Sequence, residues 1–453
     1  MKPGPVFFAG WLCAHAAFAL AATSGVLYAV RDLGALGGSS SRAHAVSERG
    51  EVVGEAETAD GQIRAFLWSA ERGMRDLGTL GGGFSRAYAV NDRGEVAGES
   101  EAPDGEIRPV RWREDTGMES LPLPPNMWDG MINGLNNFGI AVGCAETRNG
   151  PRALVWTIDG VAELAPLRTA TESAAYGVND VGWIIGRQSL PVESGIRSAP
   201  FLVDLINGKE ARSRPMDTAQ GGAALAINAQ GVAVGYVEFE EGLRAARFDP
   251  GPEPSVRLID TLENTYSIAF DINNRGEIVG TFSSSPEDDD RAFVWREGTM
   301  YDLNEWLDSA EPWHLVEARG INDRGEIVGY GILRDRERAF LLTPLPGPAS
   351  ERPVVRLVEP THGTAWSAGA PLPLKAEIEP SGASVRRVLF FANGVPVAAA
   401  TSAPYQAVWT QPGPGPQHLV AVVVAPDGKT RRSARVAVYV DWEEAEKRGD
   451  LVQ

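Results

Sequence analysis

The stretch RAYAVNDRGEVAG at residues 86–98 decides the fold, because its pattern recurs along the chain. Its core is Asn-x-x-Gly-x-x-x-Gly, and six copies keep all three residues while the first copy begins with Ser. The copies lie 43–49 residues apart. They begin at Ser47, Asn91, Asn136, Asn179, Asn228, Asn273 and Asn322. A repeat of this period indicates a chain built from stacked copies of one supersecondary unit.

Each copy predicts four short strands. One strand of small residues (87–90) precedes the motif and a second (95–98) follows it. Asn91 suits the first position of the tight turn between them because its side chain bonds nearby backbone, and Gly94 suits the fourth because it accepts positive φ. Residues 64–68 exemplify the third strand, whose apolar slot we assign to the core between units. That slot holds Trp68, Trp112, Trp156, Val203, Phe248, Trp295 and Leu342.

Four-stranded units with a period near 45 residues are typical of propeller blades. The last copy ends at Pro344 without a fourth strand, whereas residues 26–33 repeat the fourth-strand pattern of residues 74–77. We therefore expect an all-β chain with a seven-bladed β-propeller over residues 26–345. Its N-terminal strand would close the last blade and leave no open edge. An open solenoid and a ring of six or eight blades are the competing architectures.

The C-terminal part predicts a second domain. Residues 346–353 are rich in Pro and indicate a semi-rigid linker. About seven alternating strands over residues 354–440, with the hairpin signal Asn393-Gly394, then predict an Ig-like β-sandwich with Trp409 in its core. Residues 441–453 are charged and indicate a short helix or a frayed tail. The sandwich sequence resembles bacterial Ig-like modules, which commonly act as spacers or adhesion units.

The first residues predict export. Lys2 followed by the apolar run 6–22 indicates a signal peptide over residues 1–22, with an uncleaved membrane anchor as the alternative. Cleavage would leave Cys144 as the only cysteine, so no internal disulfide is expected. We expect a secreted, periplasmic or cell-surface protein that has no membrane contact after cleavage.

Composition excludes several function classes. The formal net charge is −18 and no stretch forms a basic stripe, so nucleic acid is not an expected partner. No pair of histidines or cysteines has metal-ligand spacing, and the chain contains no phosphate loop or nucleophile elbow. We therefore predict no metal, no cofactor and no catalytic set, and we expect the acidic loop 287–290 to be solvated. The 60 acidic residues leave a paired-carboxylate hydrolase open.

One slot on the first strand of each copy changes its chemistry, while its neighbours are almost always Ala or Gly. The first strand of a blade lines the central channel, so we predict a ligand site from this slot. The predicted site consists of His44, Tyr88, Asn133, Tyr176, Phe270 and Arg319, and Leu225 fills the slot of the fifth copy. Ordinary packing is the alternative interpretation. The arginines that begin third strands, such as Arg64, are expected to pair with carboxylates or carbonyls.

The repeats resemble a known family. The segments DLGTLGG (76–82), NDRG (91–94) and RAFLW (64–68) are similar to the HAF extracellular repeats of bacteria. That family is named for a His-Ala-Phe motif, and in this chain Arg stands in the His place at Arg64, Arg291 and Arg338. The resemblance covers residues 26–345 and implies an exported, propeller-like protein. It brings no functional residues to carry over.

These features predict an exported, non-enzymatic binding or scaffold protein, with a polysaccharide or a surface protein as its ligand. Rigid β scaffolds with variable loops suit binding. Two other interpretations stay open. One is a secreted carbohydrate-active hydrolase or lyase that uses carboxylates at the channel mouth, and the other is a purely structural envelope protein. The sequence does not indicate an oligomeric state.

Overall fold

The computed structural model describes most of the chain between residues 26 and 441. The described ranges are 26–164, 170–192, 195–206, 209–216, 220–250, 255–259, 266–283, 289–309, 311–345, 354–361, 363–379, 383–393, 395–426, 430–433 and 436–441. The predicted signal peptide and linker lie outside these ranges, as does the predicted tail apart from residue 441. Within these ranges, no helix is long and apolar enough to cross a membrane.

The described part of residues 28–344 forms seven four-stranded antiparallel sheets, one for each copy of the repeat. Sheet 1 contains β2 (Gly37–Val46), β3 (Val52–Thr58), β4 (Ile63–Ser69) and β5 (Gly73–Asp76). Sheet 2 contains β6 (Ser85–Val90), β7 (Val96–Glu101), β8 (Ile107–Arg113) and β9 (Gly117–Ser120). Sheet 3 contains β10 (Trp128–Leu135), β11 (Ala141–Glu146), β12 (Arg152–Thr157) and β13 (Gly160–Glu163).

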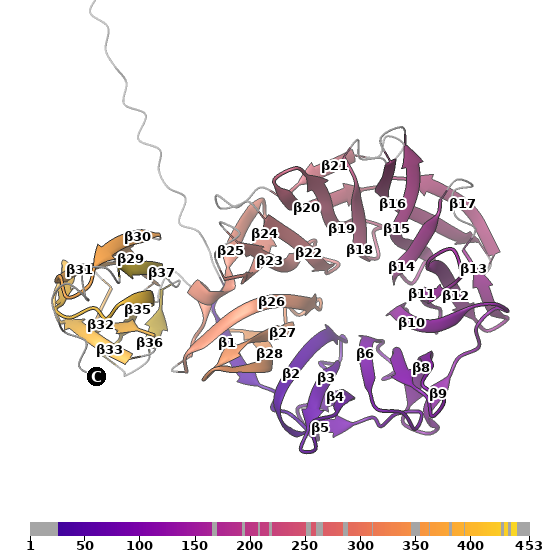
Figure 1. Cartoon of the computed structure of the whole chain (residues 1–453), viewed down its shortest axis with the longest axis horizontal. Coiled ribbons are helices and arrows are strands. Elements are labelled where there is room, and N and C mark those ends of the chain that lie inside the picture. The colour runs from indigo at the N-terminus through magenta and orange to yellow at the C-terminus, as the bar shows by residue number, and fades with distance from the viewer. Residues whose placement is uncertain are drawn as a thin grey trace, which may run out of the picture.

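The later sheets repeat this order, and Figure 1 shows all seven around a common centre with the first strand of each innermost. Sheet 4 contains β14 (Glu172–Val178), β15 (Trp183–Val192), β16 (Gly195–Ile206) and β17 (Lys209–Pro215). Sheet 5 contains β18 (Gly222–Ile227), β19 (Ala233–Phe239), β20 (Gly242–Asp249) and β21 (Ser255–Leu258). Sheet 6 contains β22 (Tyr266–Ile272), β23 (Ile278–Ser283), β24 (Arg291–Arg296) and β25 (Thr299–Asp302). Each inner strand contacts the inner strand of the next sheet.

Sheet 7 joins the two ends of this region. Its strands β26 (Trp313–Ile321), β27 (Ile327–Leu333) and β28 (Arg336–Pro344) are completed by β1 (Tyr28–Asp32). The pairing of β1 with β28 is antiparallel and runs from Tyr28 opposite Pro344 to Asp32 opposite Phe340. The predicted fourth strand from residues 26–33 is therefore present as a strand pairing. The last inner strand, β26, also contacts the first, β2.

The asparagines that begin the repeat motif link neighbouring sheets. Asn91 Oδ1 accepts hydrogen bonds from the backbone N–H groups of Arg93 and Glu95, both at 3.0 Å, which is the local role that the sequence predicts. Asn91 Nδ2 donates to the carbonyl oxygen of Asn136 in the next sheet, at 3.1 Å. The same bond to the next turn, at 3.0–3.2 Å, is made by Asn136, Asn179, Asn228, Asn273 and Asn322.

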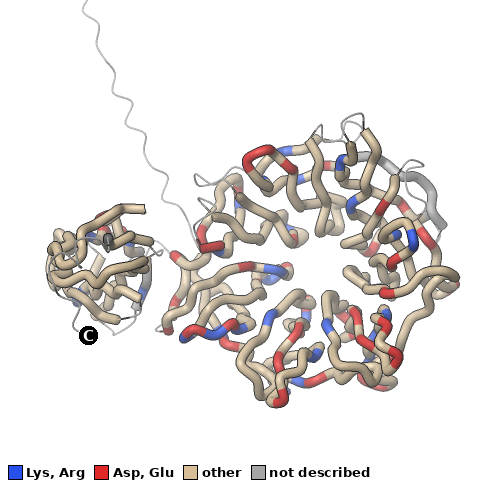
Figure 2. The backbone as a smooth tube through the Cα atoms, viewed as in Figure 1, with Lys and Arg blue, Asp and Glu red and all other residues tan. Residues whose placement is uncertain are grey.

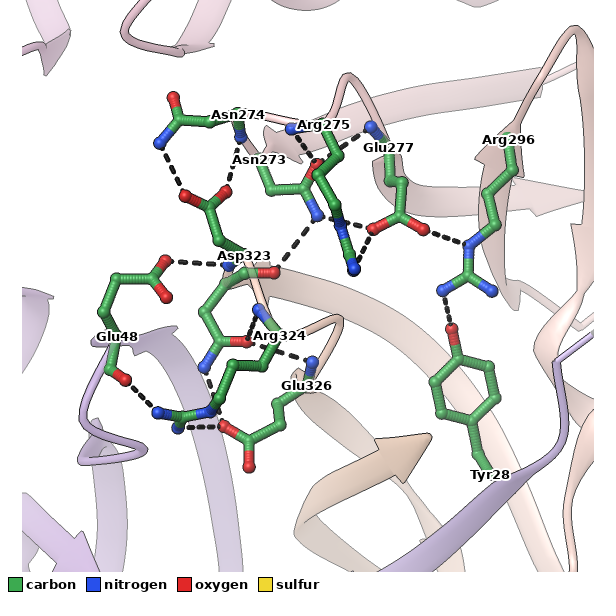
Figure 3. Close-up of polar contacts among 11 residues, drawn as sticks. Tyr28, Glu48, Asn273, Asn274, Arg275, Glu277, Arg296, Asp323, Arg324 and Glu326 are labelled. Carbon is green, nitrogen blue, oxygen red and sulfur yellow. Dashed lines mark hydrogen bonds and ion pairs between the residues drawn. The ribbon is translucent and has the colours of Figure 1, made fainter. Parts of the chain in front are cut away.

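The second residue of six of the turns adds a parallel set of links. The N–H of Glu48 donates to Asp92 Oδ1 at 2.8 Å, and the N–H of Asp323 donates to Glu48 Oε1 at 2.7 Å. Figure 3 shows both polar groups of Asn274, the backbone N–H and Nδ2, donating to the Asp323 carboxylate at 2.7 and 2.8 Å. The turns of sheets 6, 7 and 1 are thus joined directly to one another.

Sheet 1 departs from this pattern because Ser47 has no amide group. Its Oγ accepts the local bonds from the N–H groups of Arg49 and Glu51, both at 3.2 Å, but it has no N–H with which to reach Asn91. In sheets 2, 6 and 7 the asparagine Nδ2 also donates to the glutamate four residues later, at 2.6–2.8 Å. Glu51 stands at this place in sheet 1, and its Oε2 is buried without a hydrogen-bond partner among the described residues.

The backbone geometry explains why both positions of the motif hold glycine. The first is at positive φ in all seven turns, between +76° and +88°, as the sequence predicts. The second lies where two strands approach closely: a Cβ on Gly98 would be 2.0 Å from the carbonyl oxygen of Arg86, and the other copies give 1.9–2.1 Å. The register of β6 shifts there between Ala87 and Ala89, which leaves Tyr88 as the extra residue of a β-bulge. The same shift occurs in all seven inner strands.

The third-strand slot forms apolar core between sheets, as predicted. Six of its side chains are at most 5% exposed: Trp68, Trp112, Trp156, Val203, Phe248 and Leu342. Trp68 of sheet 1, for example, belongs to one apolar cluster with Val328 and Leu341 of sheet 7. Trp295 is half-buried at the edge of its cluster, so the core assignment is less complete at that position.

Residues 354–441 form a β-sandwich, and the seven predicted strands are present within the described residues. One sheet contains β29 (Val354–Glu359), β31 (Leu372–Glu379) and β34 (Tyr405–Trp409). The other contains β30 (Thr364–Ser367), β37 (Val436–Asp441), β35 (Gly415–Val424), β32 (Arg387–Ala392), β33 (Val395–Ala400) and β36 (Thr430–Arg432). The short strands β30 and β36 are additional. Trp409 is half-buried and packs against the sandwich core, as predicted.

The sandwich lies beside sheet 7 in Figure 1. It contacts the short 3₁₀ helix η1 (Leu303–Trp306), which precedes sheet 7 in the sequence, through β29 and β36. Arg431 of β36 is almost completely buried and forms an ion pair with Asp308. An ion pair therefore lies at the junction, beside this short helix.

Replacing Ser47 with Asn is expected to stabilise the protein. The added amide would donate to the carbonyl oxygen of Asn91 and to the Glu51 carboxylate, which Ser47 leaves without this donor. Satisfying a buried acceptor contributes about 1–2 kcal/mol to the stability. Urea unfolding followed by tryptophan fluorescence should give a higher midpoint for S47N than for the wild-type chain. A midpoint at or below the wild-type value would contradict this role of the amide.

Gly98→Ala is expected to destabilise the protein by more than about 3 kcal/mol, because the new Cβ would overlap the backbone of β6. Gly413→Ala is the control, since a Cβ there would meet open space. Thermal unfolding should show a large loss for G98A and little change for G413A. Equal stability of the two variants would refute the close approach of the strands.

Candidate functional site

The predicted ligand residues occupy the β-bulges of the inner strands. We call these seven side chains the inner ring: His44, Tyr88, Asn133, Tyr176, Leu225, Phe270 and Arg319. A bulge takes its extra residue out of the hydrogen-bonded ladder and re-aims the side chain. All seven are half-buried, so each keeps a part of its surface exposed. The structure thus places the predicted residues at equivalent positions on the innermost strands (Figure 1).

Members of the inner ring contact the adjacent sheets. The rings of His44 and Tyr88 lie 5.4 Å apart between centroids, at a tilt of 51°. The Arg319 guanidinium carbon lies 4.2 Å from the centroid of the Phe270 ring. Asn133 Nδ2 donates to the carbonyl oxygen of Ala175 in the next sheet, at 2.9 Å. These contacts fix the orientation of several members before any ligand binds.

His44 is held neutral. Burial among the inner strands, followed by the charges of Arg319, Arg42 and Arg86, lowers the pKa of the His44 imidazole to about 3. Its Nε2 is buried and has no hydrogen-bond partner in the described part of the chain. The inner ring therefore contains one uncharged imidazole with unused hydrogen-bonding capacity.

A second ring, which was not predicted from the sequence, lies one layer away. It consists of the residue that follows the second glycine of each motif: Glu55, Glu99, Cys144, Arg187, Tyr236, Thr281 and Tyr330. These residues pair with inner-strand residues two positions before the bulge, such as Arg42 opposite Glu55. The signal was present in the sequence, because this position varies among the copies as widely as the inner ring does.

In sheets 1 and 2 one arginine bridges two members of the second ring, and one of these also bonds a member of the inner ring. Arg86 donates through Nε to Glu55 Oε2 at 2.6 Å and through Nη1 to Glu99 Oε1 at 3.0 Å. Glu99 Oε1 also accepts a hydrogen bond from the Tyr88 hydroxyl at 2.9 Å. Burial first, and then the Glu99 charge, raises the pKa of Tyr88 well above its usual value. Tyr88 is therefore a fixed hydrogen-bond donor.

A similar cluster links sheets 7 and 1. Arg42 makes a two-pronged ion pair with Glu337, with Nε and Nη2 each 2.9 Å from a carboxylate oxygen. The Arg42 guanidinium carbon also lies 4.7 Å from the centroid of the Tyr330 ring. Burial and the charge of Glu317 raise the pKa of Tyr330 to about 12. The two carboxylates of the second ring thus lie in sheets 1 and 2, and its third charged member, Arg187, lies in sheet 4.

Asp271 is an exception among the small residues that flank the inner ring. It follows Phe270, at a position where the other six copies have Ala or Gly. Its two carboxylate oxygens accept bonds from the N–H groups of Ile321 and Ile272, both at 2.8 Å. Burial raises the pKa of this carboxyl to about 6, against the opposing effect of those two bonds. Asp271 therefore links sheets 6 and 7, and it titrates closer to neutrality than an ordinary aspartate.

The arginines that begin third strands have the expected structural partners. Arg64 donates to the carbonyl oxygen of Gly83 at 3.3 Å, and Arg291 forms a 3.0 Å ion pair with the buried Asp302. No group of three or more His, Cys, Asp or Glu in the described ranges is arranged to hold a metal ion. Asp289 and Asp290 are described, but the rest of the predicted acidic loop is not.

A groove lies beside the turns of sheets 7, 1 and 2, and we call it the turn-face groove. Its volume is about 1100 Å³. It is lined by turn residues such as Arg49 and Arg93, by the hairpin between β4 and β5, and by the exposed edges of Trp68 and Trp112. Figure 2 shows acidic and basic positions intermixed on these sheets. The groove was not predicted from the sequence, because its walls come from three different copies of the repeat.

Comparisons with known proteins identify the C-terminal domain. Residues 353–422 match the sequence profile of a bacterial Ig domain. Fibronectin(III)-like modules of CbhA from Clostridium thermocellum match at 30% identity and a TM-score of 0.18, over 19% of this chain and 94% of that one. No curated protein sequence matches the chain significantly. The chain therefore contains a bacterial Ig domain after its seven sheets.

Two solved enzymes are distant structural neighbours. A puromycin-hydrolysing peptidase of Mycobacterium tuberculosis matches at 10% identity and a TM-score of 0.43, over 88% of this chain and 61% of that one. A gluconolactonase of Xanthomonas campestris matches at 10% identity and a TM-score of 0.36, over 72% of this chain and 93% of that one.

The depressed pKa of His44 predicts a pH effect on stability. An unfolded histidine titrates near 6.5, so unfolding takes up a proton at pH values between about 3 and 6.5. His44 should therefore lower the stability of the chain as the pH falls through this range. Urea unfolding at pH 7 and pH 4.5 should show a larger acid loss for the wild-type chain than for His44→Asn. Equal losses would contradict a buried, neutral His44.

Proposed function

We propose that this chain is an exported, non-enzymatic binding protein whose inner ring contacts a polysaccharide. The observation that carries the proposal is the contrast between the framework and the inner ring. The turn glycines and the close-approach glycines repeat seven times, whereas the bulge positions between them hold seven side chains of different chemistry. Variation at these half-buried positions and in the second ring, within a framework that repeats, is typical of a surface under functional rather than structural constraint.

We further propose that the seven sheets are the blades of a seven-bladed β-propeller built from HAF-type repeats. Support comes from the unbroken sequence of contacts between neighbouring inner strands and from the pairing of β1 with β28. The HAF assignment rests on the DLGTLGG, NDRG and RAFLW segments. Export rests on Lys2 and the apolar run 6–22. The bacterial Ig domain would act as a spacer or as a second contact.

The chemistry of the inner ring favours a sugar ligand. Tyr88, Tyr176 and Phe270 offer aromatic faces, which pack against the apolar face of a sugar ring. Asn133 adds a neutral amide, a group that can bond hydroxyls. A mixture of flat apolar surfaces and neutral hydrogen-bonding groups suits a polyhydroxylated ligand better than an ion.

A carboxylate-dependent hydrolase or lyase is the alternative. Such enzymes need one carboxyl group that acts as an acid and a second that acts as a base or nucleophile. Glu55 and Glu99 lie close to the inner ring, but both are bonded to Arg86. Asp271 has a raised pKa, but both of its oxygens accept backbone N–H bonds. These bonds favour structural roles for the three carboxylates.

The test is binding to a panel of polysaccharides by the chain without residues 1–22, with product analysis on every glycan bound. We expect saturable binding without cleavage. Phe270→Ala should weaken binding tenfold or more, because it removes an aromatic face of the inner ring. Phe239→Ala is the matched control, since Phe239 is a partly exposed aromatic at the β19–β20 hairpin. Thermal unfolding would verify that both variants are folded.

Two results would contradict the proposal. Cleaved product would establish an enzyme instead. Failure of the folded chain to bind any glycan in the panel would refute a polysaccharide ligand and direct attention to a protein partner or a structural role.

A further inference from the structure

The turn-face groove contains two equivalent arginine–tryptophan stacks. The guanidinium carbon of Arg31 in β1 lies 5.6 Å from the centroid of the Trp68 ring, and that of Arg75 in β5 lies 5.0 Å from the centroid of Trp112. In both stacks an arginine on the fourth strand of one sheet covers the third-strand tryptophan of the next. The repeat therefore presents the same cationic group twice, one sheet apart, along the groove.

The stacks leave the arginines rather than the tryptophans exposed, and of the two arginines Arg75 is ion-paired with Glu114 at 2.6 Å. Trp68 and Trp112 are almost completely buried, whereas Arg31 and Arg75 are exposed. A guanidinium that stacks on an indole keeps its N–H edges free to bind a carboxylate through two bonds. In the described ranges, no carboxylate oxygen lies within 4.0 Å of a side-chain nitrogen of Arg31 or Arg93. These two arginines thus retain their full capacity for an anionic ligand.

The charge pattern of the groove restricts that ligand. Seven arginines and six carboxylates line it, in a chain whose formal net charge is −18. A polymer with one phosphate in each repeating unit needs a continuous basic surface, and the carboxylates between the arginines of the groove would repel it. A ligand with widely spaced carboxylates and many hydroxyls fits this alternation, because carboxylate side chains accept hydroxyl hydrogen bonds.

Glu71 supplies such an acceptor. It lines the groove at the hairpin between β4 and β5, and its side chain is exposed. The Oε2 of Glu51, by contrast, is buried and not accessible to a ligand, although Glu51 also lines the groove.

We propose that the turn-face groove binds an acidic oligosaccharide that contains uronate residues. Carboxylates of the ligand pair with Arg31 and Arg93, and a sugar hydroxyl donates to Glu71. The volume of about 1100 Å³ is at the upper limit for a small-ligand pocket and suits an oligomer rather than a single sugar. The groove shares no residue with the inner ring, so this inference stands or fails separately from the function proposed above.

Isothermal titration calorimetry of the chain without residues 1–22 tests the ligand class. The probes are oligogalacturonate, oligomannuronate and oligoglucuronate, with fully methyl-esterified oligogalacturonate as the uncharged match and poly-L-glutamate as a non-sugar polyanion. We expect at least one uronate oligomer to bind tenfold or more tightly than either control. Equal binding of the ester, equal or tighter binding of poly-L-glutamate, or no binding of any uronate oligomer would each overturn the inference.

Variants of the chain test the site. Arg31→Gln and Arg93→Gln should each weaken binding of the uronate oligomer about tenfold. Arg257→Gln is the matched control, because Arg257 occupies the same fourth-strand position in sheet 5, is well exposed and lies outside the groove. We expect less than a twofold change for R257Q. Equal effects of R93Q and R257Q would show that binding is not located in the groove.

Discussion

The hydrogen bond from one turn asparagine to the backbone carbonyl of the next is the interaction on which the seven-sheet region depends. Burial of apolar side chains between sheets is favourable but non-directional, so it does not by itself fix how one sheet is rotated against another. The amide bonds, such as that from Asn91 to Asn136, are directional and recur at six turns. They hold the inner strands in equivalent positions, and seven separate bulges therefore form one ring.

The sequence predicted the repeat unit, the strand from residues 26–33 and the sandwich, because each depends on local patterns or on the self-similarity of the chain. It predicted the hydrogen bonds of Asn91 within its own turn but not the bond to Asn136, since that bond joins copies that lie 45 residues apart. The bulge at Tyr88 was hidden because an extra residue does not disturb the alternation of so short a strand. The turn-face groove and the Arg86 cluster were missed because neighbouring copies build them together.

The same three sheets carry most of the unusual chemistry. Sheets 7, 1 and 2 hold the ion pairs of Arg42 and Arg86 and the two arginine–tryptophan stacks. They also include Ser47, which replaces the turn asparagine and leaves Glu51 Oε2 without a hydrogen bond. On sheets 3 and 4 the third turn residue is the exposed Phe138 or Val181 instead of arginine. A framework of nearly equal copies has thus acquired a polar sector and an apolar sector, while the positions that determine its geometry stayed the same.

The pairing of β1 with β28 has a consequence for the order of events during synthesis. Tyr28 lies opposite Pro344, so 316 residues separate two strands that must meet in one sheet. At a translation rate of roughly 5–20 residues per second, a nascent β1 waits about 16–63 s for its partner. During this interval the first six sheets can form sequentially, but the exposed edge of β1 is open to wrong partners. The strand that completes the fold is therefore the one most in need of protection before the chain is finished.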